Sequence, residues 1–136
     1  MSQSHRIPGK GLLIDRARPV RFSFDGRAYQ GFAGDTLASA LLASGTRLMG
    51  RSFKYHRPRG AMTAGSEEPS ALVEIHEGAQ QTPNVRATVQ EIYEGLEARS
   101  QNHLGPLSFD LLAVNDWMAP FLSAGFYYKT FMWPRA

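Results

Sequence analysis

Basic side chains gather in one short stretch of the sequence, GRSFKYHRPRG, which runs from Gly50 to Gly60. They are Arg51, Lys54, Arg57 and Arg59. Guanidinium groups donate paired hydrogen bonds to phosphates and carboxylates, so the stretch could hold the phosphate of a flavin or nicotinamide cofactor. Salt bridges to another domain, or a solvated rim, are the simpler interpretation, because phosphate sites usually also use a helix N-terminus. We therefore keep the four residues as candidate cofactor-binding residues only.

Histidines and carboxylates elsewhere lack partners at a spacing that favours catalysis. His56 could act as a general base, but a histidine without a positioned partner is more often structural. The other histidines, His5, His76 and His103, show no metal-ligand spacing. Glu67 and Glu68 are adjacent, and successive residues of an extended chain point to opposite faces. A solvated or helix-capping role is therefore expected for this pair, and no catalytic residue is predicted.

The segment that begins at Thr63 has the spacing of a loop that binds an iron-sulfur cluster. In plant-type 2Fe-2S loops the ligands follow the pattern C-x4-C-x2-C, with a fourth cysteine further along. Here that spacing falls on Thr63, Glu68 and Ala71, and the fourth position would be Thr88. None of these residues supplies a thiolate, and only Glu68 could ligate a metal. A cluster is excluded on chemical grounds, and the stretch SEEPS is expected to close the site by local hydrogen bonds.

The composition predicts a single small soluble domain. The chain has 136 residues, of which 43% are hydrophobic and 11% aromatic, which is enough to build a core. The absence of cysteine excludes a disulfide framework and is compatible with a reducing compartment. No apolar run approaches the ~20 residues that span a bilayer, and the first residues lack the apolar core of a signal peptide. We expect a cytoplasmic protein that does not contact a membrane.

A β-hairpin and a short helix are the first elements that the sequence predicts, and structure is expected to begin at Pro19. In VRFSFDGRAYQGF, apolar residues alternate around an Asp-Gly pair, which is a strong signal for a two-residue hairpin turn. In GDTLASALLASGTRL, Asp35 or Thr36 can cap a helix, and Gly45 can end it in the left-handed conformation. The helical spacing of its leucines and alanines favours packing of the helix against a sheet.

Further strands are predicted after the segment with cluster spacing. ALVEIHEG indicates a strand that ends in a turn at Glu77 and Gly78, and VRATVQEIYEGLEARSQN can supply two short strands around Glu94 and Gly95. A helix is expected to start at Ser108, and an aromatic segment follows at residues 126–133. A hairpin, a short helix and more strands together indicate a compact α+β unit.

Several strings in the chain resemble one family closely. The segment from Pro19 to Asn102 resembles the ferredoxin-like domain at the N-terminus of large amine-oxidising flavoprotein subunits. The strings FDGRAYQGFAGDTLASALLASG, GRSFKYHRPRG, AGSEEPSALVEI and FYYKTFMWP look like the start of the alpha subunit of heterotetrameric sarcosine oxidases. In related hydrogen cyanide synthase and opine or proline dehydrogenase subunits this loop carries the cluster cysteines, whereas the sarcosine oxidase version lacks them. The resemblance implies a ferredoxin-like α+β fold of the β-grasp type, with a small mixed sheet, one short packed helix and a C-terminal helical and aromatic extension.

The same resemblance implies a function. Enzymes of this family oxidatively demethylate sarcosine to glycine, pass a one-carbon unit to tetrahydrofolate and release hydrogen peroxide. FAD, FMN and NAD belong to the assembled enzyme, in which the alpha subunit associates with beta, gamma and delta subunits. The chain contains no GxGxxG motif, so the dinucleotide-binding domain of such an alpha subunit would lie beyond it. The isolated chain is therefore expected to bind no cofactor alone and to be inactive.

The expected organisation has three parts: an N-terminal arm (1–18), a ferredoxin-like domain without cluster cysteines (19–102), and a helical and aromatic docking extension (103–136). We predict a structural and docking domain that contacts the remaining alpha-subunit domains and the other subunits. The alternative is a nucleic-acid-binding or general protein-interaction module built on the basic stretch. The wide separation in sequence between the basic stretch and the aromatic segment argues against nucleic acid as a partner.

Overall fold

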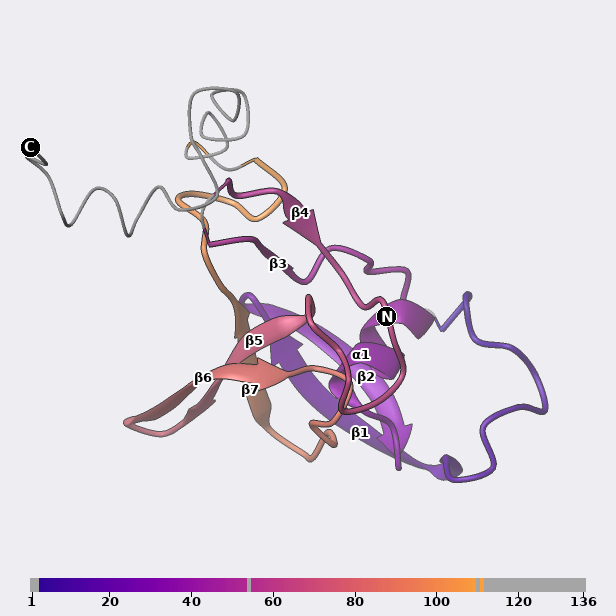
Figure 1. The fold of residues 1–136 in the computed structure, drawn as a ribbon. Coiled ribbons are helices and arrows are strands. Elements are labelled where there is room, and N and C mark those ends of the chain that lie inside the picture. The colour runs from indigo at the N-terminus through magenta and orange to yellow at the C-terminus, as the bar shows by residue number, and fades with distance from the viewer. Residues whose placement is uncertain (1–2, 54, 110, 112–136) are drawn as a thin grey trace, which may run out of the picture.

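A computed structural model describes residues 3–53, 55–109 and 111 (Figure 1). The strands are β1 (Asp15–Phe24), β2 (Arg27–Ala33), β3 (Gly50–Arg51), β4 (Pro58–Arg59), β5 (Leu72–Glu77), β6 (Gln80–Arg86) and β7 (Leu96–Ser100), and the helix α1 spans Leu37–Ala43. The aromatic segment predicted at residues 126–133, and almost all of the helix predicted from Ser108, lie outside the described residues. No helix in the described part of the chain is long and apolar enough to span a membrane.

Five strands form one mixed sheet in the order β2-β1-β7-β5-β6. Two antiparallel hairpins, β1–β2 and β5–β6, are joined through β7, which runs parallel to β1 and antiparallel to β5. The helix α1 contacts β2, and the two-stranded sheet of β3 and β4 lies apart from the larger sheet (Figure 1). This small mixed sheet with one short helix is the ferredoxin-like α+β arrangement that the sequence predicts.

The predicted first hairpin is confirmed. Asp25 and Gly26 have φ angles of 52° and 77°, which are the positive values that a type I′ turn needs. On the inner face, Phe22 and Phe24 are buried, and the ring of Phe22 stacks on that of Tyr29 with 5.6 Å between centroids. The strand differs from the prediction at its start, because β1 begins at Asp15 rather than at Pro19, with an irregularity in register between these two residues.

The predicted helix is also confirmed, with Thr36 as its N-cap. The hydroxyl of Thr36 accepts from the backbone N–H of Ser39, and the hydroxyl of Ser39 accepts from the N–H of Thr36, so each side chain satisfies a donor that the first turn leaves free. Leu37 and Leu41 are fully buried. Gly45 follows the helix with a φ of 88°, where a residue with a Cβ would be strained.

The later strands match the prediction only in part. β5 and β7 occupy the expected segments, but the strand expected just before Gly95 is wrong. Instead β6 begins at Gln80, directly after the turn at Gly78, and pairs with β5. β6 contains Pro83 and mostly exposed residues, a composition tolerated because it is an edge strand with one neighbour. Between β6 and β7, Glu91 makes only an isolated bridge with Thr36.

Candidate functional site

The basic stretch forms a small hairpin, which we call the basic hairpin (residues 50–59). β3 and β4 pair antiparallel, with Gly50 opposite Arg59 and Arg51 opposite Pro58. The sequence predicts no strand here, because two residues per strand are too few to show a pattern. Lys54, which falls between the two strands in the sequence, lies outside the described residues.

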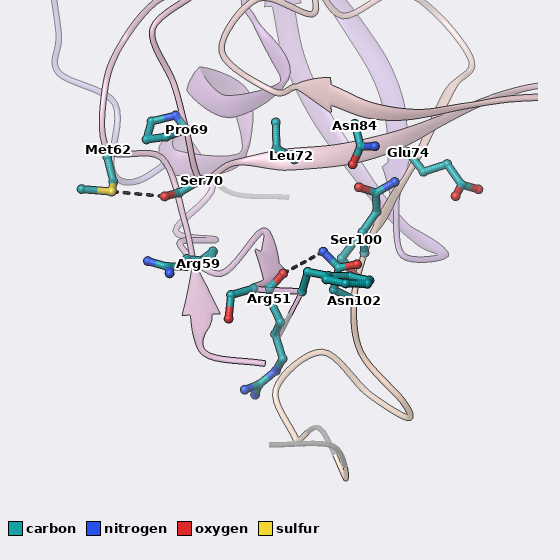
Figure 2. Close-up of a pocket in the computed structure, with 13 residues that line it drawn as sticks. Arg51, Arg59, Met62, Pro69, Ser70, Leu72, Glu74, Asn84, Ser100 and Asn102 are labelled. Carbon is teal, nitrogen blue, oxygen red and sulfur yellow. Dashed lines mark hydrogen bonds between the residues drawn. The ribbon is translucent and has the colours of Figure 1, made fainter. Parts of the chain in front are cut away.

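Among the three candidate cofactor-binding residues that the structure describes, Arg51 is the most buried, with 8% of its surface exposed. Its Nε donates to the carbonyl oxygen of Leu107 at 3.0 Å, and its Nη1 donates to that of His56 at 2.8 Å. Its own carbonyl oxygen accepts from the side-chain amide of Asn102 at 3.0 Å (Figure 2). The guanidinium therefore ties the hairpin to the segment that follows β7.

Arg59 lies on the same cavity as Arg51, whereas Arg57 does not line it. The cavity has a volume of about 1010 Å³, and the residues around it come from the basic hairpin, from β5 and β6, and from the end of β7 (Figure 2). Met62 and Ser70 belong to its wall as well. The guanidinium of Arg57 instead lies over the ring of Tyr55, 4.8 Å from its centroid, a favourable cation–π contact.

His56 occupies a buried turn position with 7% of its surface exposed and a φ of 55°. Its Nδ1 lies 2.6 Å from the carbonyl oxygen of Asn102. The ring therefore holds the hairpin against the chain after β7, which supports the structural interpretation over general-base chemistry.

The segment with cluster spacing folds into a loop around a single carboxylate. We call residues 62–71 the Glu68 loop. Contrary to the expectation of a solvated side chain, Glu68 is only 1% exposed, whereas Glu67 beside it is exposed. The carboxylate of Glu68 accepts hydrogen bonds from four backbone N–H groups, those of Met62 and Thr63 at 2.7 Å each, Ser70 at 2.9 Å and Ala71 at 3.2 Å. The hydroxyl of Thr63 donates to the same carboxylate at 3.2 Å.

These donors set the charge state of Glu68. Burial raises the pKa of the carboxyl, but the backbone hydrogen bonds from Thr63, Ser70, Met62 and Ala71 outweigh burial and lower the pKa from 4.5 to about 2. Hydrogen bonds to the charged form stabilise that form. Glu68 is therefore a buried anion at neutral pH.

The loop does not fit the cluster that its spacing suggests. Thr88, at the fourth position, donates from its hydroxyl to the carbonyl oxygen of Gly65 at 2.7 Å, so the structure brings all four positions of the spacing to one loop. Their side chains offer one carboxylate, two hydroxyls and a methyl group where four thiolates are needed. Within the described residues, no group of three or more His, Cys, Asp or Glu side chains could hold a metal ion.

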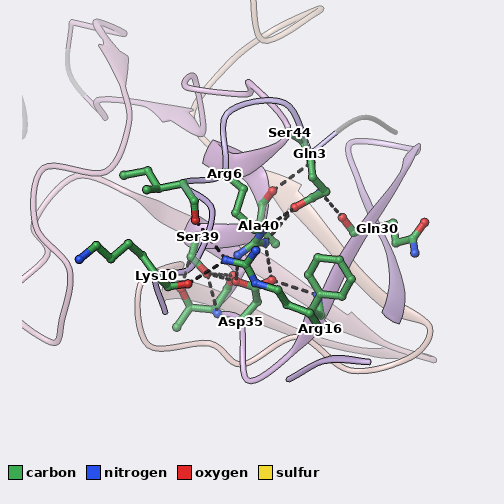
Figure 3. A network of polar contacts seen from close by, with 12 residues as sticks. Gln3, Arg6, Lys10, Arg16, Gln30, Asp35, Ser39, Ala40 and Ser44 are labelled. Atoms are coloured by element: carbon green, nitrogen blue, oxygen red, sulfur yellow. Dashed lines mark hydrogen bonds and ion pairs between the residues drawn. The ribbon is translucent and has the colours of Figure 1, made fainter. Parts of the chain in front are cut away.

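A second buried carboxylate, that of Asp35, lies at the start of α1 (Figure 3), where the sequence predicts only a possible helix cap. Asp35 is 0% exposed. Its Oδ2 accepts from Nη2 of Arg6 at 2.6 Å and from the backbone N–H of Phe32 at 2.9 Å, and its Oδ1 accepts from the hydroxyl of Ser39 at 2.8 Å. The guanidinium of Arg6 also lies 5.2 Å from the ring centroid of Phe32.

This ion pair attaches the N-terminal segment to the domain. The side chain of Gln3 accepts from Arg6 and donates to the hydroxyl of Ser44 at 2.9 Å, and the backbone N–H of His5 donates to the carbonyl oxygen of Ala43 at 3.1 Å. Residues 3–6 therefore lie along α1. No sequence signal links Arg6 to Asp35, because they are 29 residues apart.

The comparisons with known proteins agree on one family. The model of the 2Fe-2S iron-sulfur cluster binding domain matches residues 17–103. Sarcosine oxidase subunit alpha of Rhizobium meliloti (strain 1021) is 63% identical over 131 residues, which are 96% of this chain and 13% of that protein. The subunit of the same name from Corynebacterium sp. (strain P-1) is 39% identical over 115 residues, which are 79% of this chain and 12% of that protein. This chain therefore spans only a small part of the length of these relatives.

The fold also resembles a solved structure, the crystal structure of L-proline dehydrogenase from P. horikoshii. The TM-score is 0.52 at 23% sequence identity, over 64% of this chain and 16% of that chain. At this identity the likeness concerns the fold alone. The resemblance inferred from the sequence strings is confirmed: this chain belongs to the family of 2Fe-2S iron-sulfur cluster binding domains and is a homologue of sarcosine oxidase alpha subunits, although it lacks the thiolates that a cluster needs.

Proposed function

We propose that this chain is a structural and docking domain of a sarcosine oxidase alpha subunit. The whole enzyme would demethylate sarcosine oxidatively to glycine, pass a one-carbon unit to tetrahydrofolate and release hydrogen peroxide. The observation that supports this proposal is the 63% identity to a sarcosine oxidase alpha subunit over 96% of this chain. Because that match covers 13% of the relative, the reaction itself is assigned to other parts of the enzyme.

In this proposal the chain contributes no reacting group. FAD would be bound by the beta subunit, FMN between the alpha and beta subunits, and NAD by the remaining alpha-subunit domains, while the gamma and delta subunits would be further partners. Residues 1–18 would be an arm, residues 19–102 a ferredoxin-like domain of the β-grasp type, and residues 103–136 a helical and aromatic docking extension. The place of action would be the cytoplasm, without contact to a membrane or to nucleic acid.

The cavity beside the basic hairpin is the docking surface that we propose for the rest of the assembly. Arg59 brings positive charge to this cavity, and Met62 on its wall is 71% exposed. Arg51 is engaged by two backbone carbonyls, so we assign it to holding the hairpin in place. The proposal also includes contact between the basic residues and an anionic group of a cofactor or of a neighbouring subunit. Lys54 and Arg57 would take part in this contact together with Arg59.

Assembly of the enzyme with and without this domain tests the proposal. An alpha subunit that starts with this chain is co-produced with its beta, gamma and delta subunits, and a second version lacks residues 1–102. We expect the first to form a complex with sarcosine-dependent hydrogen peroxide release, and the second to lose assembly as measured by light scattering after gel filtration. The isolated chain should neither oxidise sarcosine nor retain flavin.

Two results would contradict the proposal. Turnover of sarcosine by the isolated 136-residue chain would move the chemistry into this domain. Full assembly and full activity of the version without residues 1–102 would remove the docking role. A reversed charge at Arg59 (Arg59→Glu) provides a narrower test, since it should weaken assembly while the domain itself stays folded.

A further inference from the structure

We propose that the Glu68 loop is an anion-binding loop whose anion is supplied by the chain itself. The carboxylate of Glu68 provides the negative charge around which the loop folds, and removal of this side chain would open a site for a small carboxylate ion such as acetate. The inference rests on the geometry of the loop and does not depend on the proposed sarcosine oxidase role.

The donor set around Glu68 is that of an anion site. The two carboxylate oxygens divide the donors between them. Oε2 accepts from the N–H groups of Met62 and Thr63 and from the hydroxyl of Thr63, and Oε1 accepts from the N–H groups of Ser70 and Ala71. Successive backbone N–H groups that converge on one point form a concave anion site in many loops.

Backbone amides take the role that a basic side chain would otherwise have. In the described part of the chain, no lysine or arginine makes an ion pair with Glu68. Burying a charged group without compensation is costly, and four N–H donors with one hydroxyl supply that compensation here. The loop therefore depends on the negative charge as well, because the same four amides would lose their shared acceptor if the carboxylate were absent.

The loop is also fixed from outside, so that its donors stay in place. Arg86 of β6 donates from Nε to the backbone carbonyl oxygen of Glu68 at 3.1 Å. Thr88 holds the carbonyl oxygen of Gly65, and the backbone N–H of Ala87 donates to the carbonyl oxygen of Ala71 at 2.8 Å. A loop held from outside at Gly65, Glu68 and Ala71 in this way is expected to keep its concave shape when one side chain is shortened.

This chain belongs to a family of cluster-binding domains but has no cysteine to bind a cluster. The buried charge of Glu68 offers a physical explanation for this difference. The family is one of 2Fe-2S cluster binding domains, and a cluster held by four thiolates presents negatively charged sulfur to hydrogen-bond donors. The chain has no cysteine, yet the loop at the cluster spacing still surrounds a negative charge. Glu68, which itself stands at one of the four positions, replaces the external anion with an internal one.

Rescue by an added carboxylate tests the inference. The full 136-residue chain is compared with Glu68→Ala and with Glu67→Ala, a matched control because Glu67 is the adjacent glutamate and is exposed. Each protein is unfolded by heat at neutral pH in sodium acetate and in sodium chloride of equal ionic strength. We expect Glu68→Ala to lower the unfolding midpoint by more than about 10 °C in chloride, and acetate to restore it in a saturable manner.

Nuclear magnetic resonance locates the acetate. The amide signals of Met62, Thr63, Ser70 and Ala71 should shift on acetate addition in Glu68→Ala, and they should not shift in the original chain or in Glu67→Ala. The inference is overturned if Glu68→Ala is as stable as the original chain, or if acetate acts equally on all three proteins.

A second variant keeps the test decisive if Glu68→Ala does not fold in chloride. Glu68→Gln preserves the volume of the side chain, removes the charge and turns an NH2 group toward donors. We expect it to fold with a lowered midpoint and altered signals for the same four amides. A Glu68→Gln protein with the midpoint and amide signals of the original chain would show that a neutral side chain suffices, and the anion role would be wrong.

Discussion

Asp35 and Glu68 are both buried carboxylates, with 0% and 1% of their surface exposed, but they are satisfied from different places. The partners of Glu68 lie within six residues of it and are mostly backbone amides. The strongest partner of Asp35 is the side chain of Arg6, 29 residues away. Glu68 therefore determines the conformation of one loop, whereas Asp35 joins two separate parts of the chain.

The two carboxylates therefore have different structural roles in the domain. The contact between the N-terminal segment and the start of α1 needs the long side chain of Arg6 to reach Asp35. The Glu68 loop needs only a negative charge of suitable size. Substitution of Asp35 should therefore affect residues far away in the sequence, whereas substitution of Glu68 should affect only its own loop. Changes at Asp35 should loosen residues 3–6, and changes at Glu68 should stay within residues 62–71.

The largest effect is expected for Asp35→Ala. Removing one partner of a buried ion pair leaves the other uncompensated, which costs about 3–5 kcal/mol. Since Arg6 is itself 10% exposed in its side chain, the free energy of unfolding should fall by about that amount in denaturant titrations. Hydrogen exchange at His5 should increase at the same time, because its N–H is bonded to Ala43.

Arg6→Ala and the double variant Arg6→Ala/Asp35→Ala complete a cycle for this pair. The double variant should be less destabilised than the sum of the single variants, since neither charge is then left alone. Additive effects would show that Arg6 and Asp35 are not energetically coupled. If Asp35→Ala is unfolded, Asp35→Asn serves in its place.

The next effect is a loss of stability in acid caused by Glu68. Its folded pKa, about 2, lies below the ordinary 4.5, so the folded state binds this proton less readily than the unfolded state. The stabilisation is complete above about pH 4.5 and is lost as the pH falls toward 2; it should amount to about 3 kcal/mol. We expect the stability of the original chain to fall more steeply in this range than that of Glu68→Gln. Parallel curves for the two proteins would contradict the assignment.

A smaller effect is predicted for Gly34→Ala, which tests the attachment of the N-terminal segment. Gly34 has a φ of 91°, and a Cβ there would collide with the backbone carbonyl oxygen of Leu13. Gly26→Ala is the control, because Gly26 has a φ of 77° and nothing within 4 Å of its Cβ position. Both should show the cost of a left-handed residue, about 1–2 kcal/mol. Only Gly34→Ala should also speed hydrogen exchange in residues 5–14. Equal exchange in both variants would contradict the close approach of Leu13 to Gly34.

Local signals explain which parts of this fold could be predicted. The turn at Asp25 and Gly26 depends on those residues themselves and is predicted by them. The helix cap is predicted as Asp35 or Thr36, and the structure has Thr36. β6 was missed because an edge strand tolerates polar residues and Pro83. The short pair β3 and β4 was missed because two residues per strand leave no alternation to read.

For the candidate site, the sequence predicts only what the site cannot bind, an iron-sulfur cluster. The absence of cysteine at the cluster spacing excludes thiolate ligands whatever the fold. The burial of Glu68 could not be predicted, because its partners are backbone amides and any sequence has those. The Arg6 and Asp35 pair could not be predicted either, since the contact depends on the path of the chain between them. A glutamate at a cluster-ligand position was the one available signal, and the adjacent Glu67 made it look like a solvated pair.

The smallest effect is predicted for an ion pair that resembles Arg6 and Asp35 in distance but not in burial. Arg99 Nη2 and Glu97 Oε1 are 2.8 Å apart on β7, close to the 2.6 Å of the buried pair, but these side chains are 56% and 45% exposed. Water and salt screen exposed charges, and such pairs contribute about 0.2–1 kcal/mol or nothing measurable.

A double-mutant cycle of Glu97→Ala and Arg99→Ala should therefore give a coupling energy below about 0.5 kcal/mol, decreasing with added salt. The cycle of Arg6 and Asp35 should give a coupling several times larger that changes little with salt, because both of those groups are removed from water. Nearly equal couplings in the two cycles would mean that distance alone sets the strength of these pairs, and the contrast between buried and exposed charges would fail for this domain.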